Sequence, residues 1–317
     1  MRNATKAVRL TALLAGLAMT AAACGGDDGG SGSGELAGKS FTVGSKEFTE
    51  QLIVGQMAIL MLENAGASVE DKTGLQGTEV TRSALTSGEI DMYWEYTGTG
   101  WTSHLGHDAL EAPDDPQELF DAVAKEDLEK NKIQWFALAP FENTYRIATT
   151  AERADQLGVA TMSDYAGLAN GNAADASLCA ATEFLTRSDG WPGLEKEYGF
   201  DLPDTEIAEV DLGIVFTQVP EGQQCNFGEV FSTDGRIPAN DFVTLDDDKN
   251  FFAKFNLAMS ANADVYEQNP ELEEIFTPLA EALSTEIMQE LNAQVDAEGR
   301  PAEQVAQTWL EDNGFLD

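Results

Sequence analysis

The sequence predicts an α/β protein in which a parallel sheet is covered by helices on both faces. From Phe41 onward, short apolar runs of strand length alternate with stretches of helical periodicity, and this alternation is typical of such sheets. The chain has 317 residues, 43% of them hydrophobic, which is enough apolar material for a core. Domains usually hold ~100–200 residues, so the length fits two lobes or one large domain.

The first part of this pattern can be followed element by element. A helix is expected to end at Gly66 and another at Gly88, since glycine accepts the left-handed backbone that closes many helices. The predicted elements are a strand at 41–44, a helix at 52–64, a strand at 68–70, a helix at 78–87 and a strand at 90–94.

The second part continues with an acidic amphipathic helix at 116–130. Its apolar residues, such as Leu119 and Val123, are expected to face inward and its acids to face solvent. The further predictions are strands at 133–139, 144–149, 206–210 and 227–231, helices at 151–157 and 191–198, an irregular stretch at 167–176, and a helical tail at 270–315.

The charge balance is strongly acidic. The chain carries 18 Lys and Arg against 56 Asp and Glu, a formal net charge of −38. Such a surface repels phosphate backbones and anionic headgroups, which argues against nucleic-acid binding and peripheral membrane binding. It fits a protein outside the cytoplasm whose ligand is neutral, zwitterionic or cationic.

Residues 1–23 are predicted to be an export signal. Residues 1–9 hold three basic side chains and no acid, and the apolar run at 10–23 is too short to span a bilayer and ends in small residues. Cys24 follows directly, as in a bacterial lipoprotein signal, so we expect it to be lipidated; an ordinary signal peptide with an incidental cysteine is the alternative. Residues 24–39 begin with a Gly, Ser and Asp run and are expected to form a flexible tether.

With Cys24 committed to lipid, Cys179 and Cys225 remain. An even pair in an oxidising compartment predicts a disulfide, worth ~3–4 kcal/mol in the chain-entropy model. Two buried thiols are the alternative.

The sequence contains no recognisable catalytic motif. His104 and His107 are the only histidines, and we expect both in a surface loop. The chain has no nucleophile elbow, no phosphate-binding loop and no dinucleotide fingerprint. No catalytic residue, metal site or cofactor is therefore predicted.

Several motifs occur in register along 41–317 and closely resemble those of the osmoprotectant-binding proteins of ABC importers. They are Gly44-Ser45-Lys46-Glu47-Phe48-Thr49-Glu50-Gln51, Gly77-Thr78-Glu79-Val80, Gly88-Glu89-Ile90-Asp91, Glu95-Tyr96-Thr97-Gly98-Thr99, Asn143-Thr144-Tyr145, Glu183-Phe184, Arg187, Asp189-Gly190, Ser232-Thr233-Asp234-Gly235-Arg236-Ile237 and Asp247-Asp248-Lys249. That family takes up glycine betaine, choline, carnitine and related quaternary amines.

The resemblance implies the type II periplasmic-binding-protein fold, in which two α/β lobes close over a ligand cleft. Lobe one is then expected at 40–143 plus 247–317, and lobe two at 144–246. The two crossovers are expected at 142–144 and 245–247.

The resemblance also implies the binding residues. An aromatic box for the ammonium is expected from Tyr96, Tyr145, Phe231 and Phe255, where the family usually has Tyr at the last two positions. Lys46, Thr99 and Arg187 match positions that hold the ligand's carboxylate. Lys46, Tyr96, Thr99 and Phe255 come from lobe one, and Tyr145, Arg187 and Phe231 from lobe two.

The expected protein is a monomeric, lipid-anchored, extracytoplasmic receptor that passes a quaternary-ammonium osmoprotectant to a membrane permease and its ATPase. It is expected to touch the membrane only through its N-terminal lipid. One alternative keeps the fold and changes the ligand to an amino acid, a polyamine or ectoine. The other is a sensor or adhesion domain that does not serve transport.

Overall fold

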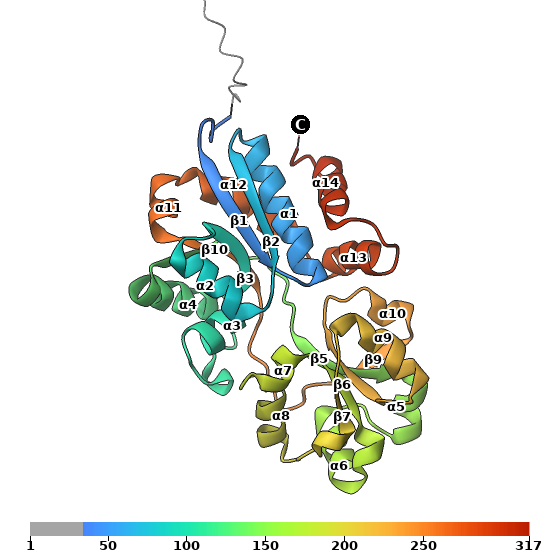
Figure 1. Ribbon diagram of the computed structural model, residues 1–317. Helices are drawn as coiled ribbons and strands as arrows, with labels where there is room; N and C mark the ends of the chain where they lie inside the picture. Colours follow the sequence, from blue (N-terminus) through green and yellow to red (C-terminus); the bar gives the residue numbers. More distant parts are fainter. Residues whose placement is uncertain (1–33, 317) are drawn as a thin grey trace, which may run out of the picture. The chain divides into compact units, whose positions relative to one another are not determined.

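The computed structural model describes residues 34–316, which form two five-stranded sheets (Figure 1). The strand order is β2-β1-β3-β10-β4 in the first sheet and β7-β6-β8-β5-β9 in the second. The chain builds most of the first sheet, makes the whole second sheet, and returns to the first with β10.

The first sheet is mixed. Strand β1 (Ser40–Lys46) pairs in parallel with β2 (Ser68–Leu75) and β3 (Met92–Tyr96). Strand β10 (Leu257–Asn262) is antiparallel to both β3 and β4 (Ile133–Phe136).

The second sheet is also mixed. Strand β6 (Leu178–Ala180) is parallel to β7 (Ile207–Glu209) and β8 (Phe227–Phe231), whereas β5 (Tyr145–Thr150) is antiparallel to β8 and β9 (Phe242–Thr244). The expectation of purely parallel sheets is therefore wrong. The antiparallel strands are those next to the crossings between the sheets, where the chain changes direction.

Helices alternate with the strands along the chain, and they include helices at 182–186, 212–221 and 236–239 that the pattern did not predict, just as it did not predict the strands at 178–180, 242–244 and 257–262. The helix bounds are α1 Thr49–Asn64, α2 Thr78–Ser87, α3 Thr97–Thr99, α4 Pro116–Asn131, α5 Ala151–Leu157, α6 Met162–Gly171, α7 Thr182–Thr186, α8 Trp191–Tyr198, α9 Leu212–Glu221, α10 Arg236–Ala239, α11 Ala263–Gln268, α12 Glu271–Ala282, α13 Thr285–Asp296 and α14 Ala302–Asp312.

Capping residues explain where helix α2 ends and where helix α6 begins. Gly88 has a left-handed backbone, φ 75°, and its N–H group closes α2 on the carbonyls of Ala84 and Leu85. Helix α6 begins with a capping box between Thr161 and Asp164. This helix was not predicted, because its Gly- and Asn-rich sequence has low helical propensity and the capping box and packing outweigh it.

Two chain segments cross between the sheets and run alongside each other. Glu142 and Asn256 form an antiparallel bridge, and the Asn143 N–H group donates to the Phe255 carbonyl oxygen at 2.9 Å. The crossing segments thereby carry Asn143 and Phe255 toward the region between the sheets.

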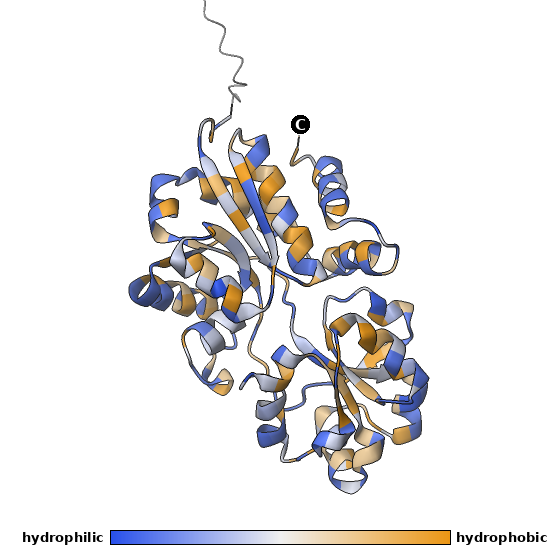
Figure 2. Cartoon of the chain, in the orientation of Figure 1, coloured by the Kyte–Doolittle hydropathy of each residue, from blue (hydrophilic) through white to orange (hydrophobic). Residues whose placement is uncertain are grey.

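The apolar residues gather on the strands and on the inner faces of the helices, whereas the hydrophilic residues lie on outer turns such as those of α4 (Figure 2). The largest buried cluster includes Tyr96, Tyr145 and Phe255, with Phe231 packed against it. This cluster contains side chains from both sheets, so aromatic contacts link the two halves of the described chain.

Two polar residues lie deeper than the sequence suggests. Asp127 of α4, expected on a solvated face, is fully buried and accepts hydrogen bonds from Arg82 and from the Trp135 indole. His104, expected in a surface loop, has a side chain only 1% exposed and lies 3.1 Å from Glu95. In both cases a partner on another element supplies the hydrogen bonds that make burial of a polar group tolerable.

The predicted tether is too long at its C-terminal end. Leu36 is fully buried, and its N–H group donates to the Ala65 carbonyl oxygen at 2.9 Å. Residues 34–39 therefore belong to the folded body. The predicted signal segment and Cys24 lie outside the described residues. Among residues 34–316, no helix is long and apolar enough to cross a membrane.

Cys179 of β6 and Cys225 form a disulfide, with their Cα atoms 5.6 Å apart. The bond is buried with Val215, Val219 and Val230 in an apolar cluster of the second sheet. It ties strand β6 to the segment that leads into β8, the central strand of this sheet.

Candidate functional site

A cavity of about 960 Å³ lies where the ends of the strands meet the crossing segments. Its lining comes from both lobes: Lys46 and Tyr96 belong to the first sheet, and Tyr145 and Phe231 to the second. Small-molecule sites usually measure ~300–1,000 Å³, so the cavity is of suitable size for a small solute. We call it the interlobe cavity.

Aromatic rings form one continuous wall of this cavity. Tyr145 lies 5.1 Å from Phe231 and 5.8 Å from Phe255, measured between ring centroids. A fifth ring, Phe48, lies 5.1 Å from Phe231 and 6.3 Å from Tyr96. The four rings predicted from the sequence therefore gather around one space, together with Phe48.

The backbone explains why these rings meet. Tyr145 and Phe231 are register partners on antiparallel β5 and β8, so their side chains leave the same face of the second sheet. Tyr96 and Leu257 are register partners in the first sheet, and Phe255 lies just before Leu257 on the returning chain. The aromatic wall is thus assembled from strand ends and a crossing segment.

A hydrogen bond to Glu50 holds the Tyr96 ring in place. The Tyr96 hydroxyl donates to Glu50 Oε1 at 2.7 Å, and the amides of Asn143 and Asn292 donate to the same carboxyl group at 2.9 and 3.2 Å. Burial raises the pKa of Glu50, while these hydrogen bonds and one with Thr233 act against the shift. The network fixes the orientation of the Tyr96 ring.

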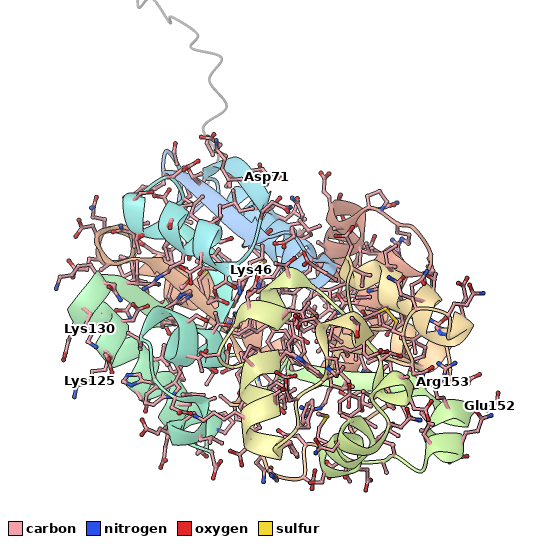
Figure 3. All side chains as sticks on the ribbon, turned by 60° about the horizontal axis from the view of Figure 1, so that its bottom comes forward. Lys46, Asp71, Lys125, Lys130, Glu152 and Arg153 are labelled. Carbon is pink, nitrogen blue, oxygen red and sulfur yellow. A yellow bond between two sulfur atoms is a disulfide. The ribbon has the colours of Figure 1, made fainter. Side chains whose placement is uncertain are left out.

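Lys46 lies inside the protein, in contrast to Lys125 and Lys130 at its periphery (Figure 3). Its Nζ atom lies 2.7 Å from Glu95 Oε1 and 5.4 Å from the centroid of the Tyr96 ring. Burial alone would raise the pKa of Glu95, but the charge of Lys46 and the hydrogen bond from His104 hold it well below its ordinary value. Burial lowers the pKa of His104, which keeps this imidazole neutral at pH 7.

Arg187 does not line the cavity. Its guanidinium donates to both carboxylate oxygens of Asp189, at 2.8 and 2.6 Å, and to Glu183 Oε1 at 3.0 Å. Its Cζ atom lies 5.8 Å from the Tyr145 ring centroid. The structure therefore places Arg187 behind the aromatic wall, with its donor fork engaged by protein carboxylates.

Hydrogen bonds join the lobes on both sides of the cavity. On one side Thr78 donates to Glu183, and Thr102 donates to Asp189. Arg187 pairs with both of these carboxylates, so it supports this side of the closure.

On the other side helix α13 contacts lobe two. The Asn292 amide donates to the Thr233 carbonyl oxygen at 3.0 Å, and Arg236 lies 3.3 Å from Asp296. The two sets of contacts describe lobes that are held together around the cavity.

Apart from the aromatic wall, most of the charged residues that line the interlobe cavity are acidic. Thr99, 3% exposed, lines the cavity beside the aromatic residues. Lys46 and Arg236 are the basic lining residues, and Arg236 pairs with Asp234 at 2.6 Å. The acidic lining residues are Glu47, Glu50, Glu183, Glu209, Asp211, Glu229, Asp234 and Asp296.

Six of the seven residues predicted to bind ligand line the same cavity: Lys46, Tyr96, Thr99, Tyr145, Phe231 and Phe255. Phe48, Glu50 and Glu229 also line it and were not predicted. Phe48 and Glu50 stand inside the motif at 44–51, and Glu229 lies two residues before Phe231 on the same strand face. Those two signals in the sequence would have identified all three.

Nothing in the described part of the chain resembles a metal centre, since residues 34–316 hold no group of three or more His, Cys, Asp or Glu side chains that could bind an ion.

Comparison with known proteins agrees with this geometry. Residues 39–312 match the family model of the substrate binding domain of ABC-type glycine betaine transport systems. The chain is 32% identical to a glycine-betaine-binding protein of Pseudomonas aeruginosa over 90% of this chain and 91% of the relative. It is 28% identical to the carnitine transport binding protein of Listeria monocytogenes, again covering 90% and 91%.

Among solved structures, a protein described as a glycine betaine/carnitine/choline ABC transporter superposes with a TM-score of 0.69 and 26% identity, covering 88% of this chain and 99% of that one. The apo form of YehZ from Escherichia coli superposes with a TM-score of 0.64 and 29% identity, covering 87% and 99%. The fold is accordingly that of the type II periplasmic binding proteins. The family consists of transport receptors rather than enzymes, and this chain belongs to it as a substrate-binding protein of osmoprotectant ABC importers.

Proposed function

We propose that this protein captures a quaternary-ammonium osmoprotectant in the interlobe cavity and delivers it to an ABC permease. The observation that carries the proposal is the wall of five rings from both lobes, each in contact with the next, which lines a cavity of about 960 Å³. We take residues 40–143 with 247–317 as one lobe and 144–246 as the other.

The physical chemistry of the ligand explains why rings are needed. A methylated ammonium carries a permanent positive charge but has no N–H group, so it cannot donate a hydrogen bond. Its recognition depends on the negative faces of aromatic rings and on the exclusion of water, and each desolvated face contributes roughly 0.5–2 kcal/mol. Several faces together supply a large part of the ~8 kcal/mol that a micromolar complex requires.

Closure couples binding to transport. The cage rings come from both lobes, so a bound ammonium contacts both and favours the closed state over the open one. A permease that recognises the closed pair of lobes then receives only loaded receptor. The family role in ABC import supports this part of the proposal.

We further propose that the receptor is a monomer outside the cytoplasm, held at the membrane by a lipid on Cys24. The signal-like sequence at 1–23 and the Gly- and Ser-rich residues that follow support the location and the lipid anchor. Replacing Cys24 with Ala should release the protein from the membrane fraction of cells without changing its ligand affinity. Retention of the Ala variant in the membrane fraction would contradict the lipid anchor.

Titration calorimetry on the mature protein tests the ligand class. The panel holds glycine betaine, choline, carnitine, proline betaine, ectoine and a set of amino acids. We expect micromolar or tighter binding of at least one quaternary amine, and much weaker binding of amino acids, whose ammonium is hydrated and unmethylated. Tight binding of ectoine or an amino acid, with no response to any quaternary amine, would overturn the proposal.

A further inference from the structure

The charges on the wall of the interlobe cavity bear on the tail of the ligand, the part beyond its ammonium group. Among the lining residues eight are acidic and two are basic. Both basic residues are held in ion pairs, Lys46 with Glu95 at 2.7 Å and Arg236 with Asp234 at 2.6 Å. A ligand carboxylate that enters this cavity therefore meets acidic groups whose neighbouring cations are already paired.

Glu229 is the carboxyl group nearest to the aromatic wall along β8. It lies two residues before Phe231, so both side chains leave the same face of the strand. Its Oε2 atom accepts the Ala181 N–H group at 2.8 Å, just after the end of β6. Within residues 34–316 its Oε1 atom has no hydrogen-bond partner, although Glu229 lines the cavity and is 1% exposed.

We propose that Glu229 reads the ligand's tail by accepting a hydrogen bond through Oε1, so that the site prefers a cationic quaternary amine with a hydroxyl tail, such as choline, over a zwitterion that ends in a carboxylate. This inference rests on the proposed function and goes beyond it, because it ranks ligands within one class.

The proposed preference rests on the free-energy cost of burying the Glu229 Oε1 atom without a hydrogen-bond donor. A buried oxygen that water no longer reaches loses its hydrogen bond unless the ligand supplies a donor. A hydroxyl tail supplies one, whereas a carboxylate tail supplies none and adds repulsion in a poorly screened space. Sites built to hydrogen-bond a ligand hydroxyl discriminate strongly against ligands without it.

The ionisation of Glu229 sets the pH at which this proposal applies, because the carboxylate accepts a hydrogen bond from a hydroxyl tail whereas the protonated acid can donate one to a carboxylate tail. Burial, together with the charge of Glu183, raises the pKa of Glu229 to about 8. A hydroxyl tail that donates to Oε1 lowers this pKa again by stabilising the carboxylate. A bound carboxylate would instead favour protonated Glu229 as a donor, which is the opposite ranking of ligands and therefore a direct rival.

Calorimetry at pH 8 with choline, glycine betaine and tetramethylammonium separates these possibilities. Tetramethylammonium presents the headgroup without any tail. The variant is Glu229→Gln, whose amide oxygen can keep the bond from Ala181 while its NH₂ group turns a donor toward the cavity. The matched control is Glu221→Gln, the same chemical change at an exposed position at the end of α9. Circular dichroism checks that both variants are folded.

We expect choline to bind the unmodified protein at least tenfold more tightly than glycine betaine. Glu229→Gln should weaken choline at least fivefold, strengthen glycine betaine, and change tetramethylammonium less than twofold, whereas Glu221→Gln should change none of them. Tighter binding of glycine betaine than of choline, or equal losses for choline and tetramethylammonium, would overturn the role of Glu229 and leave the proposed function intact. If none of the quaternary amines binds, the proposed function itself fails.

Discussion

Tyr145 and Phe231 face each other across the antiparallel strands β5 and β8, with their ring centroids 5.1 Å apart. Both belong to the second sheet, while Tyr96 and Phe255 reach the same cavity from the first sheet and the returning crossing segment. The pair thus forms the lobe-two half of a cage that is complete only when both lobes contribute.

Removing one ring should weaken ammonium binding sharply. We expect Tyr145→Ala or Tyr96→Ala to reduce affinity for quaternary amines at least tenfold in calorimetry, since each loses a desolvated aromatic face. Tyr145→Phe serves as the control and should stay within about threefold of the unmodified protein, because it keeps the ring. Equal losses in Tyr145→Ala and Tyr145→Phe would show that the hydroxyl rather than the ring matters.

Arg187 should affect all ligands alike. Its guanidinium pairs with Asp189 and Glu183, and these carboxylates accept hydrogen bonds from Thr102 and Thr78 of the other lobe. We therefore expect Arg187→Ala to weaken choline and glycine betaine by the same factor in calorimetry, through a less stable closed state. A loss confined to glycine betaine would instead support the carboxylate-binding role that the family resemblance implies.

The buried pair Lys46–Glu95 should respond asymmetrically to mutation. Lys46 is 4% exposed and Glu95 is fully buried, so Lys46→Met leaves an uncompensated buried charge and should cost about 3–5 kcal/mol of unfolding free energy. Adding Glu95→Gln removes that charge and should recover most of the loss. Urea denaturation of the two variants checks this, and a double variant no more stable than Lys46→Met would contradict it.

The disulfide should stabilise the second lobe and the cavity wall it supports. Cys179→Ser combined with Cys225→Ser opens a loop of sequence separation 46, and we expect a loss of about 3–4 kcal/mol in unfolding free energy. Because β8 carries Glu229 and Phe231 to the cavity, ligand affinity should fall as well. Unchanged melting temperature and unchanged affinity would show that the bond does not rigidify this wall.

Glu229 should make stability depend on pH. Burial first, and then the charge of Glu183, raise its pKa from 4.5 to about 8, against the opposing effects of the Ala181 N–H group and Arg187. A raised folded-state pKa means that the folded protein holds a proton that the unfolded chain releases between pH 4.5 and 8, so stability falls as pH rises through this window.

Glu229→Gln lacks this titration. Without ligand, its melting temperature relative to that of the unmodified protein should therefore rise from pH 5 to about pH 8 and level off above this pH. Scanning calorimetry over that range measures the difference, in which titrating groups that do not interact with Glu229 cancel. A difference that stays constant with pH would contradict the raised pKa.

The sequence alone determined the fold class, because local periodicity records which residues face a core. The glycine-closed helix at 78–87 and the strand at 227–231 were predictable for this reason. The family resemblance carried by several motifs also pointed to six residues that line the cavity. Strand direction was not predictable, because whether β10 runs parallel or antiparallel to β3 depends on how the chain returns from the second sheet.

Only the tertiary structure decided the electrostatics of the site. Sequence indicates that Lys46 is a cation, but its partner Glu95, 49 residues further along the chain, becomes relevant only once folding brings the two side chains within hydrogen-bond distance. The burial of Asp127, which pairs with Arg82 45 residues earlier in the chain, has the same origin. The environment of these two charged groups is set by neighbours that are distant along the chain, and local sequence carries no record of them.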